Sequence, residues 1–167
     1  MSVSHRVGSD HQLARLLQIG IVLEEVVEAR AHHHYQSLDT EAEAATLDPE
    51  IEALLAGAAE ESAVHRERLE ELIADLDAES VPFEDIERLV EAQYGQTKPD
   101  DFDGVLYDQL CNEETAYKFY DDLVAAIEAS DARFSIDRDR VLDTLRSIRE
   151  EEAEGVEEVT TIMEERD

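Results

Sequence analysis

Apolar residues recur every three or four positions along most of this 167-residue chain, and few helix-breaking residues interrupt them. Only six glycines and three prolines are present, and apolar residues make up 43% of the composition. A stripe with this period predicts an amphipathic α-helix, whereas a half-buried β-strand alternates at every second residue. The sequence therefore predicts an all-α protein. The segments that show the helical pattern are Ser9–Leu38, Asp48–Leu76, Val105–Ala129 and Ile136–Glu165.

The lengths of the connections predict how these helices pack. The first two segments, and likewise the last two, are joined by short connections, which favour antiparallel neighbours. A much longer connection separates the second segment from the third, and it contains the amphipathic stretch FEDIERLVEAQY at residues 83–94. A bundle with one long crossover is the arrangement of ferritin-like folds. We therefore expect a single domain, residues 1–167, that forms a ferritin-like four-helix bundle. A short extra helix is expected inside the crossover between the second and third helices.

The formal net charge is -30, from 44 acidic side chains against 14 lysines and arginines. Self-repulsion on this scale destabilises a compact state in dilute salt, whereas at about 1 M salt the Debye length of about 3 Å screens it. The composition resembles that of cytoplasmic proteins from halophiles that accumulate salt. We expect an acidic, halophilic protein that binds neither nucleic acid nor an anionic membrane, because no basic cluster is present to contact phosphates.

The single cysteine, Cys111, excludes a disulfide framework and a Cys-x-x-Cys metal site. No apolar stretch approaches the roughly 20 residues of a membrane span, and the N-terminus lacks the charged-then-apolar pattern of a secretion signal. The expected location is the cytoplasm.

Two stretches of the sequence share one pattern, EARAHHHYQSL at residues 28–38 and EETAYKFYDDL at residues 113–123. Each has a glutamate, six residues, a tyrosine, two residues and a leucine. In a helix, Glu28, His32 and Tyr35 of the first stretch share one face. The other two histidines of the run point about 100° and about 200° away around the helix. Glu28 and His32 are therefore candidate metal ligands from the first helix.

The second stretch places Glu113 on the same side of its helix as Tyr117 and Tyr120. A buried tyrosine beside a carboxylate usually donates its hydroxyl to a partner, so both tyrosines are candidates for orienting that carboxylate. Glu114 is adjacent, and the sequence leaves open which of the two glutamates faces inward. For both stretches the alternative is an ordinary helix face with a solvated acid at its boundary.

His65 is the one histidine of the second helix, and it falls on an apolar stripe with Leu69. Ser62 stands three residues before it, at the position where a Glu-x-x-His motif has its acid. Glu61 lies four residues before it and can reach the same face. The alternative is that His65 is a hydrogen-bonded core residue, which is the more common role of a single histidine on an inner face.

The fourth helix carries the acidic run REEEAEGVEEV at residues 149–159. When its apolar stripe is matched to that of the second helix, Glu152 takes the place of the serine and Gly155 takes the place of the histidine. The fourth helix thus has the acid without the imidazole, and the second has the imidazole without the acid. Glu151 or Glu154 is a further source of a carboxylate oxygen, and a solvated acidic face is the alternative for any one of these glutamates.

EARAHHHY and EETAYKFY resemble the first-helix signatures of the two halves of rubrerythrin-like proteins in the ferritin-like superfamily. In that family each half continues into a helix with a Glu-x-x-His motif. The resemblance covers the helix order over nearly the whole chain and a smaller set of residues at the level of motifs. It implies a di-iron carboxylate centre, used for ferrous oxidation, peroxide reduction or iron storage, in a homodimer or larger homo-oligomer.

Residue by residue, the family's ligands match Glu28, His65, Glu113 and Glu152, with Tyr35 and Tyr120 as the residues that orient the carboxylates. Helical spacing adds further candidates, namely His32 and Glu61 as ligands and Tyr117 as an orienting residue. Ser62 and Gly155 depart from the family pattern, and no rubredoxin-type cysteine module is present to deliver electrons. The expected cofactor is iron, two ions per chain if the site is complete, with manganese or zinc as alternatives.

Two functions are compatible with these features. The first is a metal-binding protein with ferroxidase or peroxide-reducing activity, for which peroxide or dioxygen is the reaction partner. The second is a degenerate ferritin-like bundle with an incomplete metal site, acting as a structural or protein-interaction module, and the departures at Ser62 and Gly155 favour it. A third interpretation is an acidic helical bundle unrelated to this superfamily.

Overall fold

Four long helices make up the structure, a computed structural model that describes residues 7–41, 49–78 and 102–166. For residues 32–41, 102–104 and 166 the description covers the backbone alone. The helices lie close to the segments predicted from the apolar period, and no strand occurs in the described residues. The prediction of an all-α fold is confirmed. The helices are α1 (Asp10–Glu41), α2 (Pro49–Ala74), α4 (Phe102–Ala129) and α5 (Arg138–Arg166).

Local sequence explains where three of these helices begin. Ser9 precedes α1, and its Oγ accepts a hydrogen bond from the Gln12 backbone N–H at 3.2 Å, which caps the first turn. The first residue of α2 is Pro49, whose missing N–H has no helical partner at this position in any case. Asp137 caps α5 by accepting a hydrogen bond from the Asp139 backbone N–H at 3.2 Å.

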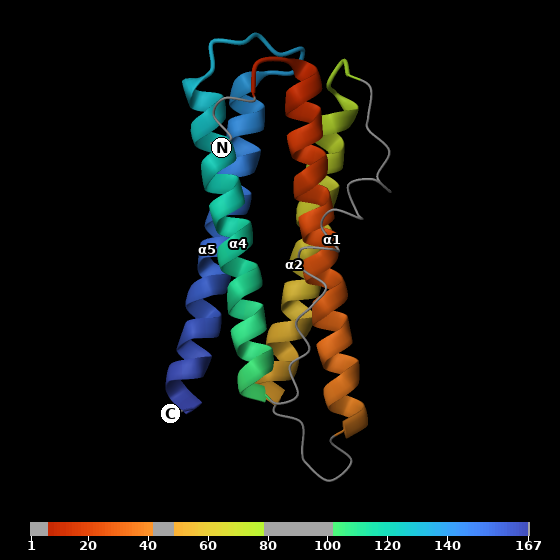
Figure 1. The fold of residues 1–167 in the computed structure, drawn as a ribbon, viewed down its shortest axis with the longest axis vertical. Coiled ribbons are helices and arrows are strands. Elements are labelled where there is room, and N and C mark those ends of the chain that lie inside the picture. Colours follow the sequence, from red (N-terminus) through yellow and green to blue (C-terminus); the bar gives the residue numbers. More distant parts are fainter. Residues whose placement is uncertain (1–6, 42–48, 79–101, 167) are drawn as a thin grey trace.

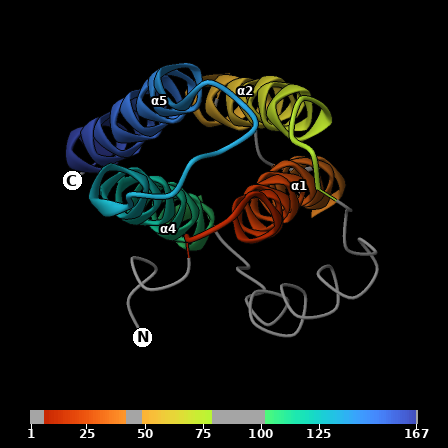
Figure 2. The same ribbon diagram turned by 90° about the horizontal axis from the view of Figure 1, so that it is seen from above.

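The helices α1 and α2 form one antiparallel hairpin, and α4 and α5 form a second (Figure 1). Seen along the bundle, α1 also packs against α4, and α2 packs against α5 (Figure 2). The helices α2 and α4 run in the same direction, because both begin at the same end of the bundle (Figure 1). This is the four-helix bundle with one long crossover that the connection lengths predict. The short helix expected at residues 83–94 lies outside the described residues.

Buried side chains form two large apolar clusters, one toward each end of the bundle. Each cluster takes residues from all four helices, and burying one large aliphatic side chain contributes about 1.5–3 kcal/mol to folding. On every helix the stretch between the two clusters carries at least one buried polar residue. The first cluster includes Leu17, Leu72, Leu123 and Leu145. The second includes Leu55, Leu106 and Val159.

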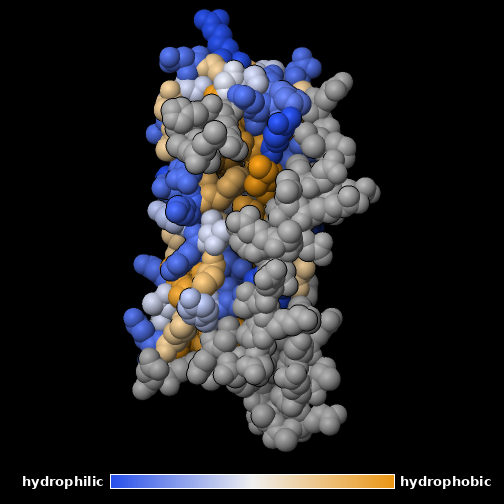
Figure 3. All heavy atoms as spheres, viewed as in Figure 1, coloured by the Kyte–Doolittle hydropathy of each residue, from blue (hydrophilic) through white to orange (hydrophobic). Residues whose placement is uncertain are grey.

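The outward faces of the helices carry the charge. Figure 3 shows hydrophilic residues over much of the described surface in this view, with hydrophobic residues between them near the middle of the face. Each pair of neighbouring helices is also joined by an arginine–carboxylate ion pair. Three of these pairs are partly exposed, a kind that contributes at most about 1 kcal/mol, whereas Asp108 of the fourth is buried. The four pairs are Arg66–Glu28, Arg68–Glu151, Arg149–Asp121 and Arg30–Asp108. No helix among the described residues is long and apolar enough to cross a membrane.

Candidate metal centre

A polar layer separates the two apolar clusters, and each helix contributes at least one ionisable side chain to it. Glu24 comes from α1, His65 from α2, Glu113 from α4 and Glu152 from α5. We call these four residues the central cluster. None of them is more than 5% exposed. Their inward direction follows from the helical period, because each stands on the same stripe as apolar core residues of its own helix.

The imidazole of His65 lies at the middle of the central cluster. Its Nδ1 atom is 3.0 Å from Glu152 Oε1 and 3.2 Å from Glu24 Oε1. The hydroxyl of Tyr120 donates a hydrogen bond to the same Glu24 oxygen at 2.6 Å. One ligand atom each from Glu24, His65 and Glu152 lies within 4.8 Å of the other two. This spacing allows the three side chains to surround a single metal ion.

Burial with little positive charge changes the protonation of these groups. Burial raises the pKa of Glu152 far above its ordinary value, and the hydrogen bond with Glu113 and the charge of Glu24 raise it further. The protonated Glu152 carboxyl therefore donates a hydrogen bond to Glu113, whose own pKa is raised by burial. The pKa of His65 is raised overall. Burial by itself lowers this pKa, but the hydrogen bond with Glu24 and the charges of the surrounding carboxylates have the larger, opposite effect. In the absence of another cation, the central cluster holds protons.

Two partly exposed carboxylates, Glu61 and Glu151, lie on the α2–α5 side of His65, and we call them the outer pair. Glu61 Oε1 is 3.7 Å and Glu151 Oε2 is 3.4 Å from His65 Nε2. The Nε2 atom is buried and makes no hydrogen bond to any described residue. Arg68 Nη1 contacts Glu151 Oε2 at 2.7 Å. Burial, followed by the charge of Glu113, raises the pKa of Glu61 to about 7.

The second hairpin has no imidazole in this layer because Gly155 stands where the Glu-x-x-His pattern puts histidine. The Glu113 carboxyl occupies the space beside it, since a Cβ atom at position 155 would lie 2.7 Å from Glu113 Oε2. Gln109, one turn earlier on α4, holds this carboxyl by donating a hydrogen bond from Nε2 to Oε1 at 2.9 Å. On the first hairpin, Ser62 is buried and supplies a hydroxyl where the pattern has a carboxylate. Each hairpin thus supplies part of a ligand set.

Most of the predicted ligands lie at or beside the central cluster. Its predicted members are His65, Glu113 and Glu152. Glu61 lies next to it, in the outer pair. Glu28 lies outside it, because its Oε2 atom accepts a hydrogen bond from Arg66 Nη1 at 2.7 Å. Of the two adjacent glutamates on α4, the first is buried in the cluster and the second, Glu114, is exposed.

The predicted orienting tyrosines occupy different environments. Tyr120 is fully buried and holds Glu24 through its hydroxyl. Tyr117, on the same helix, is 38% exposed and has no place in the polar layer. Tyr35 and the predicted ligand His32 belong to the last turns of α1, where the side chains lie outside the description.

Glu24 is the ligand candidate that the sequence analysis did not select. It stands three residues after Ile21, seven after Leu17 and seven before Ala31, all of which are buried. The helical period therefore places Glu24 on the inner stripe of α1, together with Glu28, and does not choose between them. The shared spacing of glutamate and tyrosine pointed instead to Glu28, one turn later.

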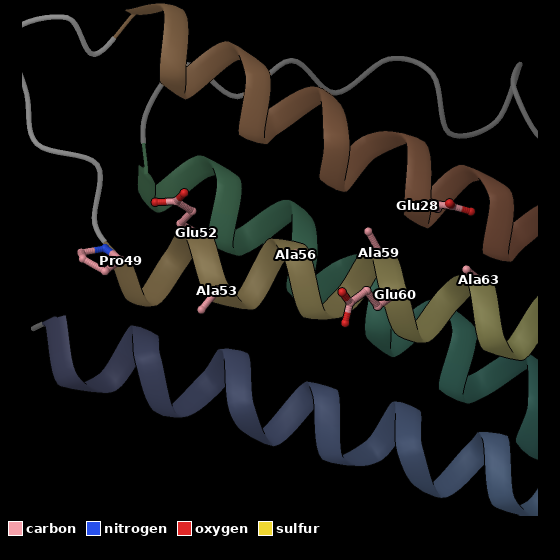
Figure 4. Close-up of a pocket in the computed structure, with 8 residues that line it drawn as sticks. All are labelled: Glu28, Pro49, Glu52, Ala53, Ala56, Ala59, Glu60 and Ala63. Atoms are coloured by element: carbon pink, nitrogen blue, oxygen red, sulfur yellow. The ribbon is translucent and has the colours of Figure 1, made fainter.

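A separate hollow of about 600 Å³ lies along α2, beside α1. Glu28 lines it from α1, and the other lining residues come from α2 (Figure 4). Half of its lining residues are alanines, and no member of the central cluster lines it, so the hollow is distinct from that cluster. The alanines are Ala53, Ala56, Ala59 and Ala63.

The donors of the central cluster fit a divalent transition metal. An imidazole nitrogen combined with carboxylate oxygens suits iron, manganese and zinc. Two buried atoms of this region, Glu24 Oε2 and His65 Nε2, make no hydrogen bond to any described residue. Unpartnered buried polar atoms are rare in folded proteins, and here the oxygen belongs to a carboxylate already oriented by Tyr120. The cluster therefore contains an oriented carboxylate with a free oxygen.

The order of acidic and imidazole residues along the four helices is that of a partial Glu-x-x-His ligand set. Function is inferred from these residues and from their geometry. Comparison of the chain with models of known protein families, with curated proteins and with solved structures finds no match.

Proposed function

We propose that this protein is a ferritin-like metal-binding protein that holds a divalent transition-metal ion, iron above all, in its central cluster. The observation that carries the proposal is the arrangement of Glu24, His65 and Glu152 around one point in a buried layer. Burying carboxylates without a compensating cation is unfavourable. A metal ion supplies the positive charge that the cluster otherwise takes up as protons.

The ligand set supports one ion in the central cluster, where the family resemblance implies two. The cluster contains one imidazole, and the neighbouring positions Ser62 and Gly155 supply no carboxylate or nitrogen ligand. The space beside Gly155 is filled by the Glu113 carboxyl. Bound iron would supply one-electron redox chemistry, which is the basis of ferroxidase or peroxide-reducing activity toward dioxygen or peroxide.

The chain's own residues prepare the site for a cation. Tyr120 fixes one oxygen of Glu24 and leaves the other without a partner. Gln109 fixes Glu113 in the same way from one turn away. Glu152 must release its proton to become a ligand, so metal binding and proton release are linked. The apolar clusters on both sides exclude water and strengthen each of these electrostatic interactions.

Metal titration of the full chain tests the proposal. Protein purified at high salt, stripped of metal and titrated anaerobically with Fe²⁺ is expected to bind about one ion per chain in the central cluster. His65→Ala removes the only nitrogen ligand of this cluster and is expected to weaken binding at least about 100-fold. The matched control is His11→Ala, since His11 is exposed on α1 and bonds to Arg15. Wild-type protein that takes up no ferrous ion contradicts the proposal.

The second candidate is a metal-free bundle that acts as a structural or protein-interaction module. It is favoured by the hydrogen-bonded carboxyl pair of Glu113 and Glu152, which is protonated in the absence of metal and lowers the need for a cation. In that case wild-type protein stays empty, and the His65→Ala change alters the melting temperature without altering metal content. Elemental analysis for iron, manganese and zinc together with thermal unfolding separates the two candidates.

A further inference from the structure

The central cluster is closed to solvent, so the composition of its surroundings decides how an ion reaches it. On the α1–α4 side, the adjacent hollow has a volume of about 10 Å³ and is lined largely by apolar residues such as Leu23, Val26 and Val27. On the α2–α5 side, the side chains of Glu61 and Glu151 are 32% and 33% exposed. Carboxylates therefore connect the cluster to solvent on the α2–α5 side, whereas apolar side chains close the other.

The outer pair and His65 have the spacing of a cation site of their own. One ligand atom each from Glu61, His65 and Glu151 lies within 4.8 Å of the other two. The buried Nε2 atom of His65 makes no hydrogen bond to a described residue and faces both carboxylates, at 3.7 Å and 3.4 Å. This buried nitrogen has only ion-pair contacts with the two carboxylates and no hydrogen bond to a described residue, and it points to a ligand between them.

A positive charge from the protein itself already lies at this position. Arg68 Nη1 is 2.7 Å from Glu151 Oε2, on the oxygen that also faces His65. The Arg68 side chain is 36% exposed, so it can leave the carboxylate without being buried elsewhere. A partly exposed pair of this kind is weak, and an incoming divalent ion competes with it effectively.

We propose that Glu61, Glu151 and His65 Nε2 form an outer cation site that captures the metal ion before it reaches the central cluster. Arg68 occupies this site in the metal-free protein and is displaced by the ion. The proposal rests on the metal binding proposed above. It assigns the two nitrogens of His65 to two sites, with Nδ1 facing the central cluster and Nε2 facing the outer pair. A single imidazole ring therefore separates the outer site from the inner one.

The rate of metal uptake tests this proposal, and its readout is optical. Metal-free full-length protein is mixed with Co²⁺ in a stopped-flow instrument at fixed salt, and the visible absorption of bound cobalt is followed. Glu61→Gln combined with Glu151→Gln keeps the side-chain volumes but removes the capturing charge. Uptake is expected to slow at least about tenfold, because converging charges raise association rates by that factor or more. The final amount of cobalt in the central cluster is expected to be unchanged.

A second variant keeps the test decisive if the double variant is poorly folded. Arg68→Gln frees Glu151 and is expected to speed uptake, whereas Arg146→Gln, an exposed arginine of α5, is the matched control. Glu154→Gln, exposed on the same helix, controls for the loss of acidic charge. If both the double variant and Arg68→Gln bind the normal final amount of cobalt at the wild-type rate, the proposed outer site is wrong, and the proposed central site is unaffected. Wild-type protein that binds no metal overturns both proposals.

One further outcome also decides the question. If the double variant at the outer pair loses its final metal content while remaining folded by circular dichroism, these carboxylates are permanent ligands. The distinction between a capture site and a central site is then wrong.

Discussion

The two hairpins contribute different chemistry to one buried layer. The α1–α2 hairpin provides the imidazole, and the α4–α5 hairpin provides the hydrogen-bonded carboxyl pair. Each hairpin lacks what the other has at the matching turn, so neither forms a complete ligand set by itself. The site therefore depends on the packing of the hairpins against each other. The residues at matching positions are Glu24, Ser62 and His65 on the first hairpin, and Glu113, Glu152 and Gly155 on the second.

The two hairpins also differ in the residues that orient the carboxylates of the polar layer. Tyr120 stands seven residues after Glu113 on α4 and reaches across to Glu24 of the first hairpin. The matching position on α1, seven residues after Glu24, is the buried Ala31, which can donate no hydrogen bond. The second hairpin thus orients a ligand of the first, without an equivalent contact in return. The proposed central site thus takes Glu24 and His65 from the first hairpin, and Glu152 together with the orienting Tyr120 from the second.

The largest expected effect comes from removing the carboxylate of the first hairpin. Glu24→Gln is expected to weaken metal binding by about 100-fold, because it replaces the buried carboxylate, whose Oε2 atom makes no hydrogen bond to a described residue, with a neutral amide. Glu28→Gln is the matched control, one turn later on the same helix and paired with Arg66 outside the central cluster. Isothermal titration with Co²⁺ or Fe²⁺ measures both. Equal losses in the two variants would show that the site extends along α1 to Glu28.

The fold was predictable because many residues along the chain independently indicate the same four helices. The apolar stripes of four segments and the two short connections all agree, so an error at one position changes nothing. Three members of the central cluster were predictable for a related reason: His65, Glu113 and Glu152 interrupt apolar stripes with polar groups. The sequence period made these positions candidates, although it left open whether Glu113 or Glu114 faces inward and whether Glu152 is solvated.

The remaining features of the site could not be predicted from the sequence, because they depend on contacts between different helices. Glu24 and Glu28 both follow the α1 stripe, and only contacts with other helices distinguish them: Tyr120 for the first, Arg66 for the second. The role of Gly155 could not be predicted either, because the sequence does not show which neighbouring side chain fills the space beside a glycine. Here that neighbour is Glu113, from another helix. With 44 acidic residues in the chain, composition gives no help in choosing among them.

The carboxyl pair of the second hairpin predicts a definite pH dependence. Burial raises the pKa of Glu113 and of Glu152, and it raises that of Glu61 on the first hairpin to about 7. These groups bind protons more tightly in the folded than in the unfolded chain. Their contribution to stability is therefore full below about pH 4.5 and is lost as the pH rises through their folded-state pKa values. Metal-free protein is expected to melt at a lower temperature at about pH 8 than at about pH 5.5.

Metal binding is expected to show the opposite trend. The ion displaces protons from these carboxyls, so affinity rises about tenfold per pH unit for each proton released. Glu113→Gln removes one titrating carboxyl and is expected to flatten both trends, while Glu154→Gln, on an exposed face, leaves them unchanged. Glu154→Gln also reports the effect of removing one charge from the acidic surface, which separates that effect from titration of the buried cluster. Identical slopes in the two variants would place the titrating groups elsewhere.

A smaller effect is expected from the hydroxyl that joins the two hairpins. Tyr120→Phe keeps the buried ring and removes the hydrogen bond to Glu24, and it is expected to weaken metal binding by about tenfold. Tyr117→Phe, on the same helix but 38% exposed, serves as the control. Cobalt titration measures the affinities, and the visible spectrum of bound cobalt reports any change in ligand geometry. Unchanged affinity in Tyr120→Phe would mean that Glu24 holds its position without help from the second hairpin.

The smallest expected effect compares a glycine from each hairpin. A Cβ atom at Gly57 of α2 would meet nothing within 4 Å, so Gly57→Ala is expected to raise the free energy of unfolding by about 1 kcal/mol through helix propensity. Gly155→Ala gains the same propensity, but its Cβ would lie 2.7 Å from Glu113 Oε2 and must displace that carboxyl. The net stabilisation is therefore expected to be smaller, with a modest loss of metal affinity. Urea unfolding of the metal-free variants measures the difference. Equal stabilisation would show that the Glu113 carboxyl moves without cost, and that the missing side chain at position 155 does not set its place in the cluster.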